Sequence, residues 1–300
     1  MSAKIPLSLP ELRVAYPSLA LFVDVAKWQK DIDWKLLGQY IDGVIVKTTG
    51  VLETGVLHID GKAQRNIAHA TAAGRVVGAY HYARQVLPSL RAAPSAATQA
   101  AYFVNQTKKI YAANKLPFAP AFMCLDLEPG ELRDARDADW TPLQIEVWVR
   151  DFMDTLQSLA PSGCRCEIYY SGACIGAADG GLDFLRDDPR FEGWLAGYPT
   201  GGPSAKNFPS KPLGLPDGWP WGAWQFSSDG KSPGVAGDLD LNVCRPGSVF
   251  ERIMKGGKPP AAAPSALLPL VGLVAAVGGL ALYRRPSLWR RLKSKLRRLF

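Results

Sequence analysis

Short apolar runs alternate with helical stretches along most of this chain, and this alternation limits the folds that it can adopt. The runs are rich in aliphatic and aromatic residues and contain few polar interruptions. Such near-continuous apolar character suits strands of a parallel sheet that is covered on both faces. We expect strands at residues 20–25, 43–48, 76–82, 121–128, 166–171, 193–198, 223–227 and 239–243.

Helical stretches fit between several of these strands. Residues 60–73 precede Gly74, which suits the end of a helix, and residues 95–113 are rich in alanine. Thr141 can cap a third helix that has Pro142 at its first position. The alternation predicts an α/β fold, an irregular TIM-like (β/α) barrel. The irregularity is expected because the late strands leave too little sequence between them for full helices.

The positive charge of the chain is concentrated at one end. The net charge is +8, from 35 Lys and Arg against 27 Asp and Glu. Residues 284–300 hold eight of the basic residues and no acid, so the first 283 residues carry 27 charges of each sign. A neutral body does not provide the basic surface that nucleic-acid binding requires, and we expect no nucleic-acid partner.

The cysteines do not indicate a disulfide scaffold or a metal site. There are five in a chain of 300 residues, an odd set for a secreted disulfide framework. Cys164, Cys166 and Cys174 lie close together, but they lack the two-residue gap and the nearby histidines of zinc sites. We expect small apolar filler residues, and neither a metal nor another cofactor.

The composition changes on both sides of the barrel, residues 20–254. Residues 1–19 form an N-terminal extension whose prolines and charges interrupt any apolar run, so we expect no cleavable signal peptide there. Residues 255–265 are a Pro/Ala/Gly linker. Residues 266–283 contain no charge over 18 positions, about the minimum for a transmembrane helix, although a buried core helix has the same composition.

Residues 284–300 continue as a basic amphipathic helical tail. Leu288, Leu292 and Leu296 fall on one helical face, and arginines and lysines fill the rest. We expect residues 266–300 to bind anionic membrane lipid. The positive-inside rule then places the C-terminus in the cytoplasm and the barrel in the periplasm or another extracytoplasmic space. Release through a phage-made membrane lesion, or a tail that acts from one side without spanning, would account for the missing export signal.

The predicted strand at residues 121–128 ends in two acids. Side chains alternate along a strand, so Asp126 and Glu128 project to one side and the leucines beside them to the other. Pro129 and Gly130 are then expected to start a loop. Acids are common at strand ends, but two neighbouring carboxylates are costly unless they bind a cation, pair with bases or transfer protons.

An ordered series of motifs surrounds this pair. It begins with Asp-Val-Ala-Lys-Trp-Gln at residues 24–29 and Gly-Ala-Tyr-His-Tyr at residues 78–82. It ends with Trp-Gln-Phe-Ser at residues 224–227 and Gly-Asp-Leu-Asp-Leu-Asn at residues 237–242. Over about residues 20–245 the series resembles glycoside hydrolase family 25, the N-acetylmuramidases or Chalaropsis-type lysozymes, and the chain looks like a phage endolysin of this kind.

The resemblance implies a muramidase that hydrolyses the β-1,4 bond between N-acetylmuramic acid and N-acetylglucosamine in peptidoglycan strands. It implies Glu128 as the catalytic acid, Asp126 as its partner, and Asp24 and Asp240 as the other acids of the site. Glycoside cleavage needs such a proton donor and such a negative charge. Two mechanisms are open: attack on the sugar by Asp126 or Asp240, or attack by the substrate's own 2-acetamido group, oriented by Asp126. The Asp-x-Glu spacing favours the second.

Aromatic rings and amides are expected to complete the cleft, because the C–H faces of sugars pack on aromatic rings. His81, between two of the tyrosines, is expected to be structural. The substrate-binding candidates are Trp28, Tyr80, Tyr82, Tyr170, Trp194, Trp224 and Gln225.

Two segments depart from the family pattern. Ala26 and Lys27 stand where the family has Ser followed by His or Tyr. The run Lys-Thr-Thr-Gly at residues 47–50 lacks the acid of the family's Lys-Ala-Thr-Glu-Gly. Both segments would line the cleft near Asp24, so we expect them to affect substrate preference and rate more than the reaction itself.

Two other functions fit many of the same residues. A catalytically weak wall-binding or virion structural protein would keep the sugar cleft for adhesion, but it would not need both Asp126 and Glu128. A chitinase-like hydrolase would share the Asp-x-Glu spacing, but the early Trp-Gln and late Asp-Leu-Asn motifs argue against it.

Overall fold

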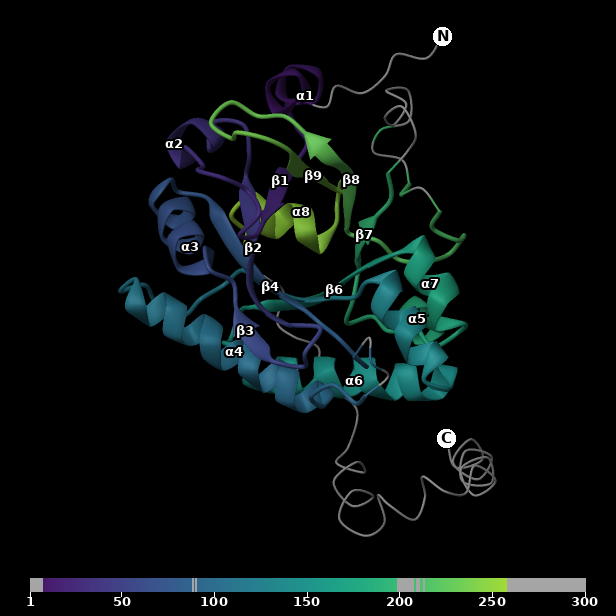
Figure 1. Ribbon diagram of the computed structural model, residues 1–300. Coiled ribbons are helices and arrows are strands. Elements are labelled where there is room, and N and C mark those ends of the chain that lie inside the picture. Colours follow the sequence, from purple (N-terminus) through teal and green to yellow (C-terminus); the bar gives the residue numbers. More distant parts are fainter. Residues whose placement is uncertain are drawn as a thin grey trace. The chain divides into compact units, whose positions relative to one another are not determined.

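The computed structural model describes residues 8–87, 89, 91–198, 208, 211–212 and 214–257, and at its centre eight strands form a closed ring (Figure 1). Around the ring lie β1 (Leu21–Val25), β9 (Leu239–Cys244), β8 (Ala223–Gly230), β7 (Trp194–Ala196), β6 (Arg165–Ser171), β5 (Phe122–Asp126), β4 (Val76–Tyr82) and β2 (Gly43–Val51). Pairing of β1 with β2 closes the ring. The short strand β3 (Leu57–Ile59) pairs antiparallel with the end of β2 and is not part of the ring.

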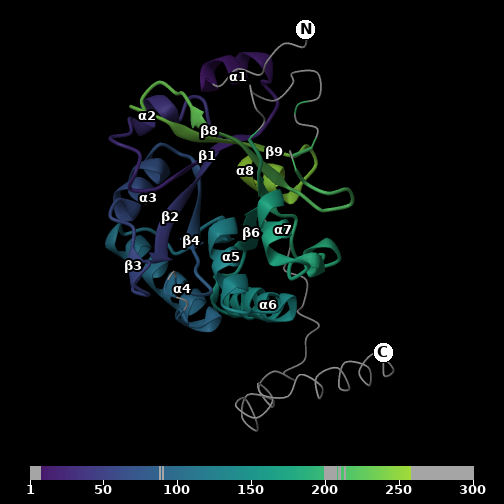
Figure 2. The same cartoon turned by 45° about the vertical axis from the view of Figure 1, so that its right-hand side comes forward.

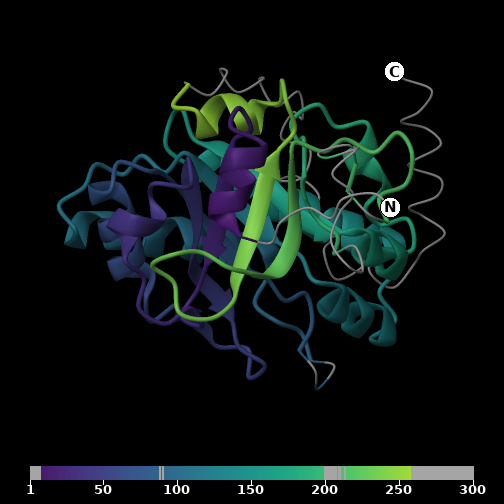
Figure 3. The same cartoon turned by 90° about the horizontal axis from the view of Figure 1, so that it is seen from above.

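One strand makes the barrel irregular. β9 runs antiparallel to both of its neighbours, β8 and β1, whereas the other pairs of the ring are parallel. β8 and β9 lie side by side as a hairpin, which needs no helical crossover (Figure 3). The prediction of an α/β barrel with an irregular late side is confirmed, and each predicted strand segment overlaps one strand of the ring.

Helices cover the outside of the ring. α3 (Ala63–Ala72), α4 (Ala96–Ala113) and α6 (Pro142–Leu159) lie along it (Figure 1), and α5 (Pro129–Asp137) lies beside α7 (Gly172–Ala178) (Figure 2). Thr141 and Gln144 form a capping box at the start of α6. The other described helices are α1 (Leu9–Ala15), α2 (Trp34–Leu37), the 3-10 helix η1 (Asp183–Arg186) and α8 (Val249–Met254).

The chain after β5 differs from the prediction. β5 ends at Asp126, and Glu128 is the N-cap residue of α5 with an extended backbone (φ −111°, ψ 147°). Pro129 and Gly130 begin this helix and do not start a loop. Proline is favoured in the first turn of a helix, where its missing N–H costs no hydrogen bond. Because the backbone stays extended through Glu128, the predicted alternation of side chains still holds there.

Side chains of the ring alternate between two apolar cores. Those that face outward, such as Val23, Val44 and Met123, pack against the helices. Those that face inward, such as Phe22, Cys124 and Trp194, fill the barrel. Cys124 is fully buried two residues before Asp126, as the strand alternation predicts.

The inward core is closed at the amino-terminal ends of the strands by α8. Phe250 of α8 is fully buried, and its ring stacks on Phe122 with centroids 4.6 Å apart and planes inclined by 14°. Gly43 at the start of β2 permits this approach, because a Cβ there would lie 2.5 Å from the sulfur of Met254. The barrel is therefore plugged at one end.

The segments predicted for the C-terminal region lie largely outside the described residues. The transmembrane candidate at residues 266–283 and the basic tail at residues 284–300 lie there, as does most of the linker. None of the helices that the structure describes combines the length and the apolar character needed to cross a membrane.

Replacing the plug should destabilise the fold. Phe250→Ala should lower the free energy of unfolding by about 3–5 kcal/mol, because it removes a stacked ring and leaves a cavity. Val14→Ala, at a position 85% exposed on α1, should change it by less than about 0.5 kcal/mol. Urea denaturation measures both, and equal effects would contradict the role of α8 as a plug.

Candidate active site

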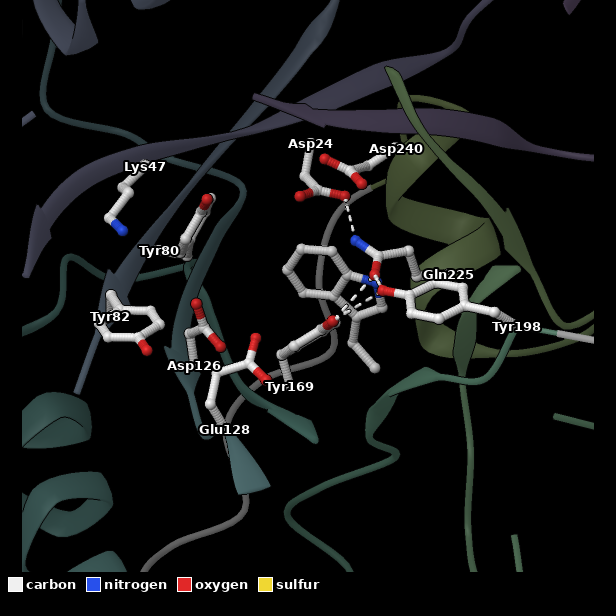
Figure 4. A pocket seen from close by; sticks show the side chains of 11 residues that line it. Asp24, Lys47, Tyr80, Tyr82, Asp126, Glu128, Tyr169, Tyr198, Gln225 and Asp240 are labelled. Atoms are coloured by element: carbon white, nitrogen blue, oxygen red, sulfur yellow. Dashed lines mark hydrogen bonds between the residues drawn. The ribbon is translucent and has the colours of Figure 1, made fainter. Parts of the chain in front are cut away.

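A pocket opens toward the carboxyl ends of the parallel barrel strands, where antiparallel β9 begins. Figure 4 shows the side chains that line it. Its lining is polar and aromatic and comes from all eight strands of the ring and from the segments that follow β5 and β7. The lining residues are Asp24, Lys47, Tyr80, Tyr82, Asp126, Glu128, Tyr169, Trp194, Tyr198, Gln225 and Asp240.

Strand register brings the acids together. Asp24 on β1 is paired directly with Asp240 on β9, and Tyr82 on β4 is paired with Asp126 on β5. Side chains of directly paired antiparallel residues lie on the same face of a sheet. All four predicted acids therefore line one pocket, Asp24 with Asp240 on one side and Asp126 with Glu128 on the other (Figure 4).

Asp24 is held by two amides. Its Oδ2 accepts hydrogen bonds from Gln225 Nε2 at 2.7 Å and from Asn242 Nδ2 at 2.9 Å. Burial raises the pKa of Asp24 to about 6, and the two amide donors oppose this rise because they stabilise the carboxylate.

Asp126 and Glu128 have fewer partners. The Oδ1 atom of Asp126 is buried and has no hydrogen-bond partner in the described part of the chain. Burial, followed by the charge of Glu128, raises the pKa of Asp126 well above its ordinary value. Burial, followed by the charge of Glu131, raises the pKa of Glu128 to about 7.

Asp240 completes the set. Burial, followed by the charge of Asp24, raises its pKa to about 9. With four raised carboxyl pKa values in one pocket, the acids do not all ionise at neutral pH, and the site carries protons that can be donated.

The rest of the wall is fixed by hydrogen bonds. Gln225 Oε1 accepts hydrogen bonds from the hydroxyls of Tyr169, at 2.8 Å, and Tyr198. Its amide is thereby oriented toward Asp24. Trp194 Nε1 donates to Asn242 Oδ1 at 2.7 Å, which orients the second amide in the same way.

Three predicted substrate-binding residues are not in the pocket. Tyr170 follows Tyr169, and Trp224 precedes Gln225, and both of these neighbours line the pocket. Strand alternation therefore places Tyr170 and Trp224 in the outward core, where they are buried. Trp28 lies in the segment after β1 and is 73% exposed, with Lys27 Nζ 4.6 Å from the ring centroid. The expectation that these three line the cleft is therefore corrected.

The other four candidates, Tyr80, Tyr82, Trp194 and Gln225, line the pocket as expected. His81 is fully buried between Thr49 and Gln99, and burial lowers its pKa to about 3.

Sequence reasoning missed Lys47, Tyr169 and Tyr198. Strand alternation could have found Tyr169, because it lies next to Tyr170 and faces the other way. Within the described residues, no group of three or more His, Cys, Asp or Glu side chains is arranged to hold a metal ion.

Comparison with known proteins gives one consistent result. The sequence model described as "Glycosyl hydrolases family 25" matches residues 23–235. Lysozyme M1 of Streptomyces globisporus is 26% identical over 222 residues, which are 73% of this chain and 66% of that protein. The chain thus spans about two thirds of the length of this relative.

Solved structures share the fold. A bacterial lysozyme from Streptomyces coelicolor superposes with a TM-score of 0.57 at 20% identity, over 79% of this chain and 97% of that one. The catalytic domain of endolysin ply40, from bacteriophage P40 of Listeria monocytogenes, has a TM-score of 0.55 at 20% identity, over 80% and 98% of the two chains.

The raised pKa of Asp240 predicts a pH-dependent effect of its removal. A carboxyl whose folded pKa is raised destabilises the fold as the pH rises from its ordinary value of about 3.9 through its folded value. Asp240→Asn should therefore raise Tm by several degrees at pH 8 and leave it nearly unchanged at pH 4. Thermal melts at both pH values measure this, with the exposed Asp187→Asn as the control. A gain at pH 4 as large as at pH 8 would argue against the raised pKa.

Proposed function

The chain belongs to glycoside hydrolase family 25, and from this premise we propose that it is a muramidase. It hydrolyses the β-1,4 bond between N-acetylmuramic acid and N-acetylglucosamine in peptidoglycan. The observation that carries this proposal is the Asp126–Glu128 pair, buried in one pocket with Asp24 and Asp240. Paired carboxyl groups on either side of a glycosidic bond perform this hydrolysis.

Glu128 is the general acid in this proposal. Its pKa of about 7 means that the carboxyl holds a proton in mildly acidic solution, and it gives this proton to the leaving glycosidic oxygen. The carboxylate that results then takes a proton from the water that attacks the anomeric carbon, which restores the acid.

Asp126 is the partner that handles the substrate's 2-acetamido group. A buried acceptor without a donor is costly, and the N–H of the acetamido group relieves that cost at Oδ1. The acetamido oxygen is then directed at the anomeric carbon, and Asp126 stabilises the positive charge that forms on the group. This supports the acetamido-assisted route over direct attack by Asp126 or Asp240.

The opposite wall stabilises the same transition state. Asp24, held by two amides, supplies negative charge to the oxocarbenium-like sugar, with Asp240 beside it. The rings of Tyr80, Tyr82 and Trp194 provide faces for the sugar C–H groups.

The C-terminal residues add a membrane function to this proposal. The uncharged run at residues 266–283 and the basic residues at 284–300 tether the enzyme to a membrane rich in anionic lipid, as in a membrane-bound endolysin. The catalytic domain then works on the extracytoplasmic side, where peptidoglycan lies, with the C-terminus in the cytoplasm.

Glu128→Gln should lower the rate of peptidoglycan hydrolysis by about 10²–10⁴-fold, because glutamine cannot donate the proton. Wild-type activity should fall as the pH rises above about 7, where Glu128 loses its proton. Muropeptide release followed by mass analysis measures the rate and identifies the bond that is cut.

The matched control is Glu146→Gln on the surface of α6, which should keep wild-type activity. Wild-type rates in Glu128→Gln would refute the acid assignment. Products with N-acetylglucosamine at the reducing end, or cleavage of chitin without cleavage of walls, would refute the muramidase proposal.

Deleting residues 264–300 should move the protein from the membrane fraction to the soluble fraction. Fractionation of cells that express the full chain or the deletion measures this by immunoblot. A triple Arg290→Glu, Arg291→Glu, Lys293→Glu variant separates the contribution of charge from that of the apolar run. An unchanged distribution in the deletion variant would refute the tether.

A further inference from the structure

Among the described residues that line the pocket, Lys47 is the one cation, and neither the sequence motifs nor the mechanism above gives it a role. It lies on β2, and its Nζ is 4.3 Å from the ring centroid of Tyr82 and 5.9 Å from that of Tyr80. In the described part of the chain, no carboxylate oxygen lies within 4.0 Å of this ammonium. The rings hold it by cation–π attraction, and its charge remains available to more distant acids.

Two of the acids near Asp126 and Glu128, Glu131 and Asp24, have partners of their own. Glu131 accepts a hydrogen bond from Tyr82 at 2.6 Å and pairs with Arg84 at 3.1 Å. Asp24 accepts from its two amides. Within the part of the chain that the structure describes, the charge of Lys47 acts on both Asp126 and Glu128, and it lowers the pKa of each against the effect of burial.

The pKa of Lys47 depends on burial and on several neighbouring charges. Burial lowers its pKa, and the charges of Asp126, Asp60 and Glu128 oppose that effect. Lys27, in the segment after β1, adds to the lowering. His58 on β3 lies near enough for Lys47 to lower its pKa.

We propose that Lys47 is a positioning residue for the Asp126–Glu128 pair, and that its ammonium is the counter-charge that lets the pair release one of its two protons while Glu128 keeps the other. The proposal deepens the proposed function and rests on it for the activity measurements alone. It also assigns a role to the lysine of the Lys-Thr-Thr-Gly segment, which lacks the acid of the family pattern.

Removing the charge should raise the pKa values of the pair as a unit. The doubly protonated pair then persists to higher pH, so the acidic limb of the pH–activity profile should move up by about one pH unit in Lys47→Met. Lys47→Arg keeps the charge and the ring contact, and its limb should stay at the wild-type position. Lys35→Met, which removes an exposed lysine on α2, controls for net charge.

A stability measurement on the full-length variants tests the same idea without any activity. At pH 4 the Asp126–Glu128 pair is protonated, so removing the Lys47 charge costs it little. At pH 7 one carboxyl of the pair is ionised, and in Lys47→Met this carboxylate loses its counter-charge. The Tm deficit of Lys47→Met should therefore be several degrees larger at pH 7 than at pH 4. A purely structural role, through lost contact with the tyrosine rings, would give the same deficit at both pH values.

The two arms separate the proposals. If wild-type protein does not cleave peptidoglycan, the proposed function fails, and the pH dependence of the Tm deficit still tests Lys47. A Tm deficit that is equal at pH 4 and pH 7 overturns the role of Lys47. An activity loss in Lys47→Met that is uniform across pH, with an unmoved acidic limb, overturns it as well.

Discussion

Closure of the sheet determines which side chains share the pocket. Because β1 pairs with both β2 and β9, every second residue of the ring must face the interior, which in an eight-stranded barrel is just wide enough for side chains. Phe22 and Cys124 fill the interior, and Asp24 and Asp126 are the next inward positions of the same two strands. A shift of one residue in the register of either strand would send its acid to the outward face.

Burial then gives the acids their chemistry. A carboxylate taken from water into this pocket is destabilised, and the hydrogen-bond partners that offset this cost differ from one acid to the next. Asp24 receives two amide donors, whereas one oxygen of Asp126 has no hydrogen-bond partner among the described residues. The same desolvation that weakens the fold at high pH therefore keeps a proton on an acid near neutral pH, as the proposed general acid requires.

The barrel and the four acids could be predicted from the sequence, and much of the wall could not. Continuous apolar runs and an ordered motif series are local signals, and they can be recognised without knowing how distant parts of the chain pack together. Which of two adjacent aromatic residues faces the pocket depends on where each strand begins. The sequence favours Tyr170, whereas Tyr169 is the residue that lines the pocket. Trp28 belongs to a segment whose path depends on contacts with Asp60 and Lys62, more than thirty residues away. Lys47 is not among the residues that the sequence predicts for the site, because its place beside the acids depends on the pairing of strands that are distant in the sequence.

The plug formed by α8 has a consequence for how a polymer can be handled. A barrel that is filled below its acids by Phe22, Phe122 and Phe250 offers no passage, so a glycan cannot be threaded through it. The glycan chain must lie across the open end of the pocket. A glycosidic bond in the middle of the glycan is then as accessible as a bond at its end. Geometry of this kind permits internal scission, which breaks a network into large pieces with few cuts.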